Sequence, residues 1–182
     1  NLIDGLDGLA AGIATIASIA IALLAFQMGQ WVAAAAMIAM TGACLAFLQY
    51  NFNPAKIFMG DTGATFLGYI LATLSVTGLF KMYAIISFAV PFLILGVPIF
   101  DICFAFLRRI AKGQNPMKAD RGHVHHRLID MGFSQKQAVA ISYMLAAILG
   151  LAAVLLTSSG ELKALILIGT IFVVGAIGMR VI

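Results

Sequence analysis

The sequence predicts an all-α fold: a polytopic membrane protein with about six transmembrane helices. Of the 182 residues, 63% are hydrophobic and only 10% are charged. Soluble domains carry about 25% charged residues, so this chain lacks the polar side chains needed to cover a water-exposed surface. Its apolar residues form continuous runs without alternation, which favours membrane helices over a membrane barrel. The formal charge of +4 is too small to indicate a nucleic-acid partner.

Six apolar segments are long enough to cross the hydrocarbon layer, which takes about 20 residues of helix. They are residues 8–26, 31–48, 63–80, 83–107, 138–156 and 162–179. Pro91 and Pro98 lie within the fourth segment. Because proline removes a backbone donor and clashes with the preceding turn, we expect this helix to be kinked or broken.

The basic residues predict which side of the membrane each loop faces. If six crossings alternate, eight of the eleven Lys and Arg residues fall on one side, in the loops after the second and fourth segments. They are Lys56, Arg108, Arg109, Lys112, Lys118, Arg121, Arg127 and Lys136. Arg180 exits on the same side, whereas Lys81 and Lys163 fall on the other. The positive-inside rule makes the basic side cytoplasmic, and residues 1–7 then face the cytoplasm too.

The first polar cluster on that face is NLIDGLDG at residues 1–8. Asp4 and Asp7 are three residues apart, which places both on one face of a helical turn. With the Asn1 amide, they stand at the mouth of an apolar helix, where two carboxylates suit a cation or a polar substrate. The alternative is that one Asp caps the helix and the other is simply solvated.

The second cluster is NFNPAKIFMGDTG at residues 51–63. Asp61 stands between glycines at the mouth of the third segment and resembles a ligand for a hard cation. Mg²⁺ typically binds one or two carboxylates together with substrate phosphate oxygens. The alternative is a tight turn with an Asp or Thr cap. Phe58 is either an aromatic anchor at the lipid interface or a platform that stacks on a planar base.

The third cluster is DRGHVHHR at residues 120–127, which holds every histidine of the chain. Imidazole and guanidinium groups together suit anionic ligands such as phosphates. Three histidines crowded between arginines are a poor tetrahedral set for zinc. Attraction of basic residues to anionic lipid is the alternative, although it leaves three histidines in four positions unexplained.

Two further features flank this loop. Asp101 lies inside the fourth segment, where an ionisable group is by default a candidate functional residue. An ion pair with Arg108 or Arg109 is the alternative. Ser134 and Gln137 have the spacing of a capping box that opens the fifth segment.

Taken together, the clusters resemble the polyprenyl-phosphate N-acetylhexosamine-1-phosphate transferases of glycosyltransferase family 4. The resemblance is carried by four stretches in the family's order: NLIDGLDGLAAG at 1–12, NPAKIFMGDTGATFLG at 53–68, PIFDICFAFLRR at 98–109 and DRGHVHHRLIDMGFS at 120–134. The HVHHRL form resembles the branch that uses UDP-N-acetylglucosamine. The peptidoglycan-precursor branch shows a run of consecutive histidines instead.

The resemblance implies a role for each matched position. Asp61 corresponds to the ligand of the catalytic Mg²⁺, with Mn²⁺ as the alternative metal. Asn51 and Phe58 correspond to residues that contact and stack on uracil. The residues implied in catalysis are Asp4, Asp7, Asp61, His123, His125 and His126, and those implied in substrate binding are Asn1, Asn51, Phe58, Asp101, Arg121 and Arg127.

The implied reaction moves N-acetylglucosamine-1-phosphate from UDP-N-acetylglucosamine to undecaprenyl phosphate and releases UMP. It would be the first membrane step of a cell-envelope glycan, such as teichoic acid or the O-antigen of lipopolysaccharide. The implied location is the bacterial inner (plasma) membrane, as a multi-pass protein with cytoplasmic active-site loops and a homodimer as one candidate assembly. A phospho-N-acetylmuramoyl-pentapeptide transferase is the alternative. A transporter is the more distant one, because it would need polar sites near the bilayer midplane.

One departure from the family concerns an adjacent Asp-Asp pair on an earlier cytoplasmic loop. No two acidic residues are adjacent in this sequence. We therefore expect residues 1–182 to form a single transmembrane transferase domain that lacks its N-terminal helices and is inactive alone.

Overall fold

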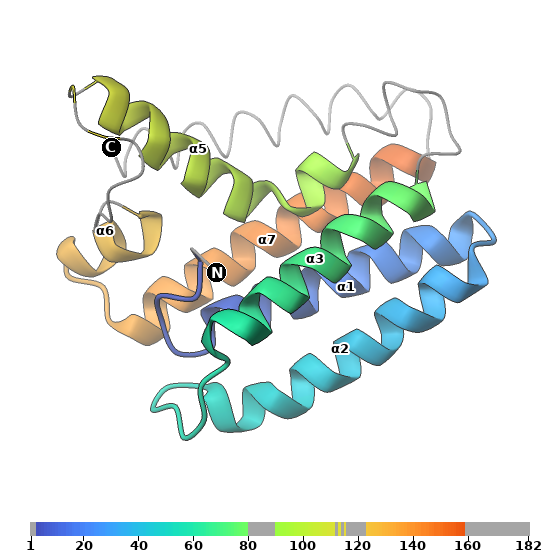
Figure 1. The fold of residues 1–182 in the computed structure, drawn as a ribbon, viewed down its shortest axis with the longest axis horizontal. Coiled ribbons are helices and arrows are strands. Elements are labelled where there is room, and N and C mark those ends of the chain that lie inside the picture. The colour runs from blue at the N-terminus through green and yellow to red at the C-terminus, as the bar shows by residue number, and fades with distance from the viewer. Residues whose placement is uncertain (1–2, 80–89, 112, 114, 116–122, 159–182) are drawn as a thin grey trace.

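The computed structural model describes residues 3–79, 90–111, 113, 115 and 123–158, and every regular element in these ranges is a helix (Figure 1). The helices are α1 (Leu9–Gln27), α2 (Trp31–Asn51), α3 (Gly60–Leu79), α5 (Gly96–Ala111), α6 (Val124–Asp130) and α7 (Gln135–Ser158). Among the described helices, α1, α2 and α7 are long and apolar enough to cross a membrane. The prediction of an all-α, polytopic membrane protein is confirmed.

Most predicted segments appear as helices with slightly different ends. Segments 8–26, 31–48, 63–80 and 138–156 correspond to α1, α2, α3 and α7, while segment 162–179 lies outside the described residues. α2 continues through Asn51, because nothing before Pro54 breaks the helix and the Asn51 side chain finds partners. α3 begins at Gly60, so that Asp61 lies in its first turn, where a carboxylate suits the helix dipole.

The fourth predicted segment is broken, as its prolines predict. The helix that reaches Ile94 is interrupted at Leu95, and α5 resumes at Gly96. Pro98, in the first turn of α5, has no N–H to bond back across this break. Residues 83–89 of the segment lie outside the described part of the chain. After the break at Leu95, α5 crosses the other helices at an angle, and its C-terminal end stands away from the bundle (Figure 1).

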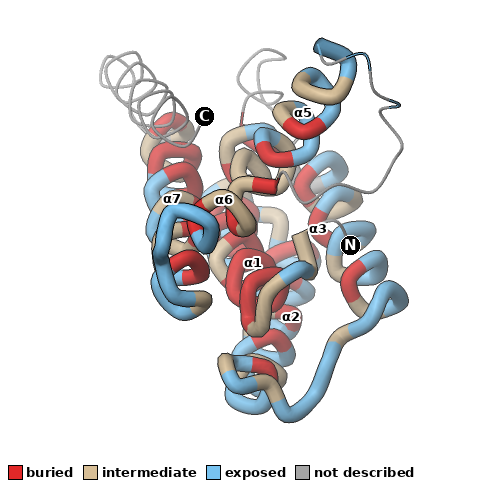
Figure 2. The backbone as a smooth tube through the Cα atoms, turned by 90° about the vertical axis from the view of Figure 1, so that its left-hand side faces the viewer, coloured by how far each residue is buried: buried red, intermediate tan, exposed pale blue. Residues whose placement is uncertain are grey.

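α1 is the central helix of the bundle. It packs against α2, α3 and α7, and its residues are apolar on every side, as expected for a helix surrounded by other helices. Alanines on α1, including Ala14, Ala17 and Ala20, let the neighbouring backbones approach closely. The hydroxyl groups of Ser18 and Thr41 share a hydrogen bond of 2.8 Å between α1 and α2. Figure 2 shows the resulting buried interior, viewed from the end that carries α6.

A glycine on α1 makes room for an aromatic side chain of α7. A Cβ atom at Gly12 would lie 2.0 Å from Cζ and Oη of Tyr143. The Tyr143 hydroxyl donates a hydrogen bond to the carbonyl oxygen of Gly8, just before α1 begins. Tyr143 therefore ties α7 to the start of α1, and the tie depends on the missing side chain at Gly12.

We expect Gly12→Ala to destabilise the protein by about 1–3 kcal/mol, because the methyl group must displace the Tyr143 ring. Thermal unfolding in detergent measures the change. Gly42→Ala in α2 is the matched control, since a Cβ there meets nothing within 4 Å and alanine favours the helix. Equal unfolding temperatures for the two variants would contradict this packing.

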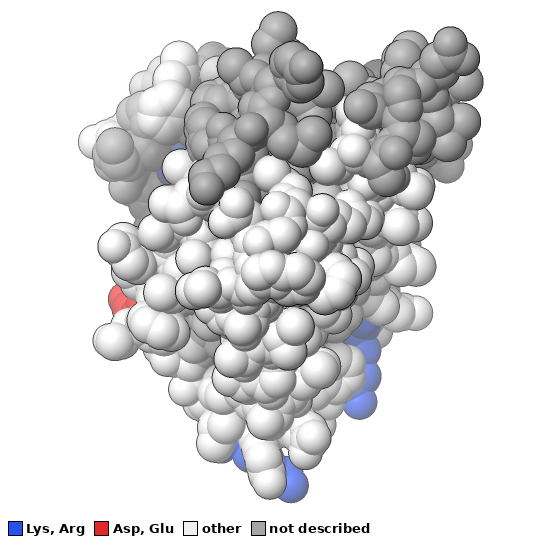
Figure 3. All heavy atoms as spheres, turned by 90° about the vertical axis from the view of Figure 1, so that its right-hand side faces the viewer, with Lys and Arg blue, Asp and Glu red and all other residues white. Residues whose placement is uncertain are grey.

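The two ends of the bundle differ in chemistry. The N-terminal turn, the α2–α3 loop and α6 gather at one end (Figure 1). Seen from the opposite end, the described surface shows charged atoms only at the edges of the view (Figure 3). Phe26 and Trp31 meet edge to face at 5.1 Å between α1 and α2. The polar clusters predicted to share one membrane face thus share one end of the fold.

Candidate functional site

The acidic turn, residues 3–8, precedes α1 and belongs to no helix. Gly8 precedes the first residue of α1 with a φ of 80°, no side chain caps that helix there, and its first turn contains no acidic residue. The alternative in which Asp4 or Asp7 caps α1 is therefore wrong. The Asn51 amide oxygen accepts a hydrogen bond from the Gly8 N–H at 3.0 Å, so that α2 supplies the partner for this backbone donor.

Asp7 connects the acidic turn to the α2–α3 loop, residues 52–59. One Asp7 carboxylate oxygen accepts hydrogen bonds from Asn53 Nδ2 at 3.0 Å and from the Ala55 N–H at 3.1 Å. Asn53 Nδ2 also donates to Gln135 Oε1 at 2.9 Å, at the start of α7. Asp7 and Asn53 thus bring three segments together. Asn53 had no role in the sequence predictions, and only its place in the second cluster pointed to it.

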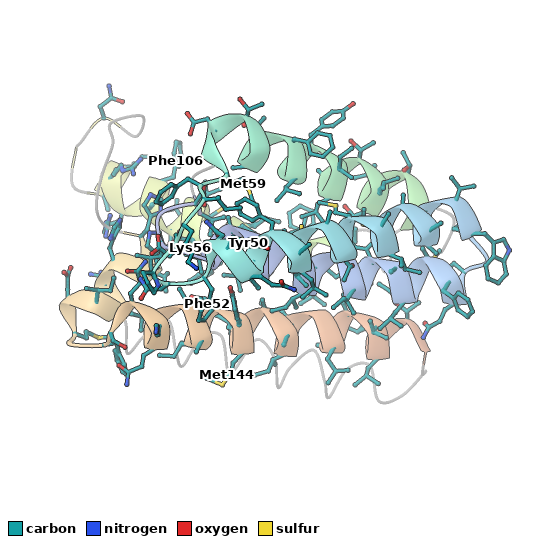
Figure 4. All side chains as sticks on the ribbon, turned by 90° about the horizontal axis from the view of Figure 1, so that it is seen from below. Tyr50, Phe52, Lys56, Met59, Phe106 and Met144 are labelled. Atoms are coloured by element: carbon teal, nitrogen blue, oxygen red, sulfur yellow. The ribbon has the colours of Figure 1, made fainter. Side chains whose placement is uncertain are left out.

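Asn51 is buried beneath the same loop. It is 5% exposed, and its Nδ2 donates to the Ile57 carbonyl oxygen at 2.9 Å. Tyr50, Phe52, Lys56 and Met59 lie around this end of α2 and its loop (Figure 4). Phe58 is 75% exposed, an orientation open to lipid or to a planar ligand. The uracil contacts of Asn51 and Phe58 stay predictions.

The acidic turn also meets the start of α3. Burial raises the pKa of Asp4, and the nearby Asp61 carboxylate raises it further. Asp61 itself is exposed. The structure therefore places two carboxylates from separate clusters within electrostatic reach of each other. Carboxylate oxygens are the ligands that a hard cation such as Mg²⁺ prefers. Among the described residues, no group of three or more His, Cys, Asp or Glu side chains is placed to hold a metal ion.

Residues 124–127 of the third cluster lie in α6, a short helix that sequence reasoning placed in a loop, and His123 immediately precedes it. The His123 and His125 rings stack with 5.6 Å between their centroids, and the His126 ring is tilted against His125 at 4.4 Å. The Arg127 guanidinium lies 5.9 Å from the centre of the Phe104 ring on α5. All three histidines and Arg127 are thus held on one small element. Asn1 and Arg121 lie outside the described residues.

His125 reaches across to the acidic turn. A Cβ at Gly5 would lie 2.5 Å from His125 Nε2 and 3.2 Å from its Cε1, so the ring fits only because residue 5 has no side chain. His125 is 3% exposed, and its Nε2 atom is buried without a hydrogen-bond partner in the structure. Burial lowers the pKa of His125 to about 4, with a further contribution from His126. The ring is therefore neutral near pH 7.

This shifted pKa predicts an acid sensitivity. The unfolded chain takes up a proton at His125 near pH 6.5, whereas the folded chain resists it until about pH 4. Stability should therefore fall as the pH drops between these values, by up to about tenfold in the unfolding equilibrium per pH unit. Thermal unfolding at pH 7 and pH 5 measures the fall, which should shrink in His125→Gln. An equal fall in both proteins would exclude His125 as its source.

Asp101 is almost fully buried, at 4% exposure, and contacts the first histidine. Its Oδ2 lies 2.9 Å from His123 Nδ1, and its Oδ1 accepts a hydrogen bond from the Val124 N–H at 2.7 Å. This partnership joins α5 to the start of α6 across 22 residues. The sequence did not predict the contact between Asp101 and His123, because its only signal was an ionisable residue inside an apolar helix.

An apolar groove runs beside the histidines, between α1, α5, α6 and α7. The space that it leaves for water-sized molecules is about 50 Å³. Side chains such as Ile13, Phe100 and Leu145 line it, and Asp101, His125 and Arg127 are among its few polar residues. The capping box predicted at the start of α7 is confirmed. The Ser134 N–H donates to Gln137 Oε1 at 2.8 Å, and the Gln137 N–H donates to Ser134 Oγ at 3.3 Å.

Known proteins share the sequence that builds this end of the bundle. Residues 1–79 match the family model described as glycosyl transferase family 4. The chain is 45% identical over 159 residues to a Bacillus subtilis (strain 168) protein named as a probable undecaprenyl-phosphate N-acetylglucosaminyl 1-phosphate transferase, covering 87% of this chain and 44% of that protein. It is 32% identical over 154 residues to the undecaprenyl-phosphate alpha-N-acetylglucosaminyl 1-phosphate transferase of Escherichia coli (strain K12), covering 82% and 42%.

A third relative is the decaprenyl-phosphate N-acetylglucosaminephosphotransferase of Mycobacterium tuberculosis (strain CDC 1551 / Oshkosh). The chain is 36% identical to it over 168 residues, covering 79% of this chain and 40% of that protein. The chain thus spans less than half the length of these relatives. With its family-model match over residues 1–79, these identities and its apolar helical bundle, the chain is an integral membrane protein similar to the transferases of glycosyl transferase family 4.

Proposed function

We propose that the chain forms the donor-binding part of a transferase that moves N-acetylglucosamine-1-phosphate from UDP-N-acetylglucosamine to undecaprenyl phosphate. The single observation that carries the proposal is the meeting of three clusters at one end of a membrane bundle. Asp4 lies within electrostatic reach of Asp61, and Gly5 lies against His125. The three relatives bear names of transferases that act on undecaprenyl or decaprenyl phosphate.

The carboxylates on this end suit a metal-bound diphosphate. Asp61, with Asp4 beside it, would hold Mg²⁺, with Mn²⁺ as the alternative. When bound, the ion neutralises negative charge on the diphosphate. Asp7 keeps the α2–α3 loop beside this position through its bonds to Asn53 and Ala55.

The histidine helix suits the phosphate and sugar side of the donor. His125 is neutral, and its buried Nε2 has no hydrogen-bond partner in the structure, while Arg127 stands two residues further along α6. In the transfer, an oxygen of the lipid phosphate forms a bond to the β-phosphorus while the bond from that phosphorus to the bridging oxygen breaks. UMP leaves with the bridging oxygen, and positioning together with charge stabilisation supplies most of the rate.

The bundle supplies a route for the lipid acceptor. The apolar groove between α1, α5, α6 and α7 presents the surface that a prenyl chain requires, with polar side chains of α5 and α6 in its lining. Placing this end at the cytoplasmic face of the bacterial inner membrane brings soluble UDP-sugar to the same end. The product would begin a cell-envelope glycan such as teichoic acid or O-antigen.

The test uses the full-length protein in nanodiscs, with undecaprenyl phosphate as acceptor and Mg²⁺ present. We expect UMP release from UDP-N-acetylglucosamine and at least tenfold slower release from UDP-N-acetylmuramoyl-pentapeptide. The reverse preference would move the protein to peptidoglycan synthesis. Failure to release UMP from either donor by a well-folded protein would overturn the transferase proposal and leave transport as the alternative.

A further inference from the structure

The Asp101–His123 pair has a geometry that a simple ion pair or helix cap does not require. The two carboxylate oxygens are divided between two donors: Oδ2 faces the imidazole Nδ1 at 2.9 Å, and Oδ1 accepts from the Val124 backbone at 2.7 Å. One bond restrains the rotation of the ring, while the other fixes the backbone that carries it. Asp101 of α5 therefore restrains both the His123 ring and the backbone next to it.

From this geometry we propose that Asp101 is a positioning residue that holds His123 with a proton on Nδ1, so that Nε2 is the ring nitrogen left to act on substrate. The inference rests on the proposed transferase function. It changes the role of Asp101 from the substrate contact implied by the family resemblance to a residue that acts through His123.

The surroundings make this bond effective. Asp101 and His123 are 4% and 8% exposed, so water competes little for the carboxylate or for Nδ1. An ionised carboxylate only accepts hydrogen bonds, and the ring nitrogen facing it must therefore carry the proton. Carboxylates orient histidines in this way in catalytic triads and metal centres, where they select the tautomer.

The pair also fixes the other histidines. The His123 ring lies parallel to that of His125, within 8°, and His125 in turn lies against Gly5 of the acidic turn. The chain of contacts from Asp101 through His123 and His125 therefore ends beside Asp4. Loss of the Asp101 carboxylate would loosen His123, which is the member of this series of contacts furthest from the proposed metal ligands.

The first test reads the tautomer directly in the full-length protein. Nitrogen-15 NMR of histidine-labelled protein in nanodiscs distinguishes a protonated from a bare Nδ1. The His123 signals are assigned by their loss in His123→Asn, whose side-chain amide can still donate to Asp101. We expect a protonated Nδ1 in the wild type and an increased share of Nε2-protonated ring in Asp101→Asn. A bare His123 Nδ1 in the wild type would overturn the proposal.

The second test separates positioning from substrate contact. Asp101→Asn keeps the size of the side chain and an oxygen for the Val124 N–H, but it removes the acceptor for His123. We expect kcat for UMP release to fall about 100-fold, with KM for UDP-N-acetylglucosamine changed less than about threefold. Combining it with His123→Asn should lower kcat little beyond His123→Asn alone.

The matched control is Asp130→Asn, which removes an exposed carboxylate at the end of α6 and should leave kcat unchanged. An unchanged kcat in Asp101→Asn, or a raised KM with unchanged kcat, would overturn the positioning role. If the wild-type protein releases no UMP, the proposed function fails, while the NMR measurement still decides whether Asp101 sets the tautomer.

Discussion

Asp61→Asn should lower Mg²⁺-dependent UMP release by the full-length protein about 100- to 1,000-fold. The change is isosteric and lies in the exposed first turn of α3, so the fold should survive it. It removes a negative charge that the structure places close enough to Asp4 to raise the pKa of that carboxyl group. A divalent cation bound between the two groups would lose a ligand and much of its attraction.

A titration of Mg²⁺ against initial rate measures this effect. We expect a higher Mg²⁺ requirement and a lower rate at saturation in Asp61→Asn, with Asp130→Asn matching the wild type. If Asp61→Asn has wild-type rates at every Mg²⁺ concentration, the proposed metal position is wrong although the family resemblance stands.

Gly5→Ala is expected to lower kcat about 100-fold with little loss of stability. The added methyl group would lie 2.5 Å from His125 Nε2. Since the ring is buried and lies against both His123 and His126, it must leave the acidic turn to make room. The effect falls on activity because the displaced His125 Nε2 has no hydrogen bond to lose, unlike the Tyr143 hydroxyl that Gly12→Ala displaces.

Steady-state kinetics and thermal unfolding of the same preparation separate these two effects. Gly42→Ala is again the control, because a Cβ there has open space. A Gly5→Ala protein that keeps its rate would show that the close approach of His125 has no part in the reaction. Equal losses of rate and stability would point to a general disruption instead.

The membrane helices could be predicted because their cause is local. Continuous apolar runs and breaks such as Met28-Gly29-Gln30 set the bounds of α1 and α2 to within a few residues. The break before α5 followed from proline chemistry, and the capping box of α7 from the spacing of Ser134 and Gln137. Each of these features depends on neighbours in the sequence.

The contacts that build the site could not be predicted in the same way, because their partners lie far apart in the chain. Asn51 satisfies the Gly8 N–H from 43 residues away, and Asn53 reaches Gln135 across 82 residues. Capping of α1 by one aspartate of the acidic turn was the alternative interpretation, because carboxylates suit helix N-termini. In the fold, Asp7 instead bonds to the α2–α3 loop, and a buried amide from α2 takes the Gly8 donor.

Gly5 was also beyond sequence reasoning alone. A glycine between two aspartates reads as a flexible turn, and nothing nearby indicates that an imidazole from α6 will occupy the space beside it. The need for glycine at this position follows only from the structure, in which a Cβ at Gly5 would collide with the His125 ring. The meeting of the acidic turn with the histidine helix is therefore the main result that the structure adds.

A double-mutant cycle between Gly5 and His125, measured as kcat for UMP release by the full-length protein, tests this meeting most directly. We expect Gly5→Ala to lower kcat about 100-fold when His125 is present, but less than about threefold in a His125→Ala background, where the methyl group has room. The same 100-fold loss in both backgrounds would contradict it, because the two residues would then act independently and the acidic turn and histidine helix would not form one site.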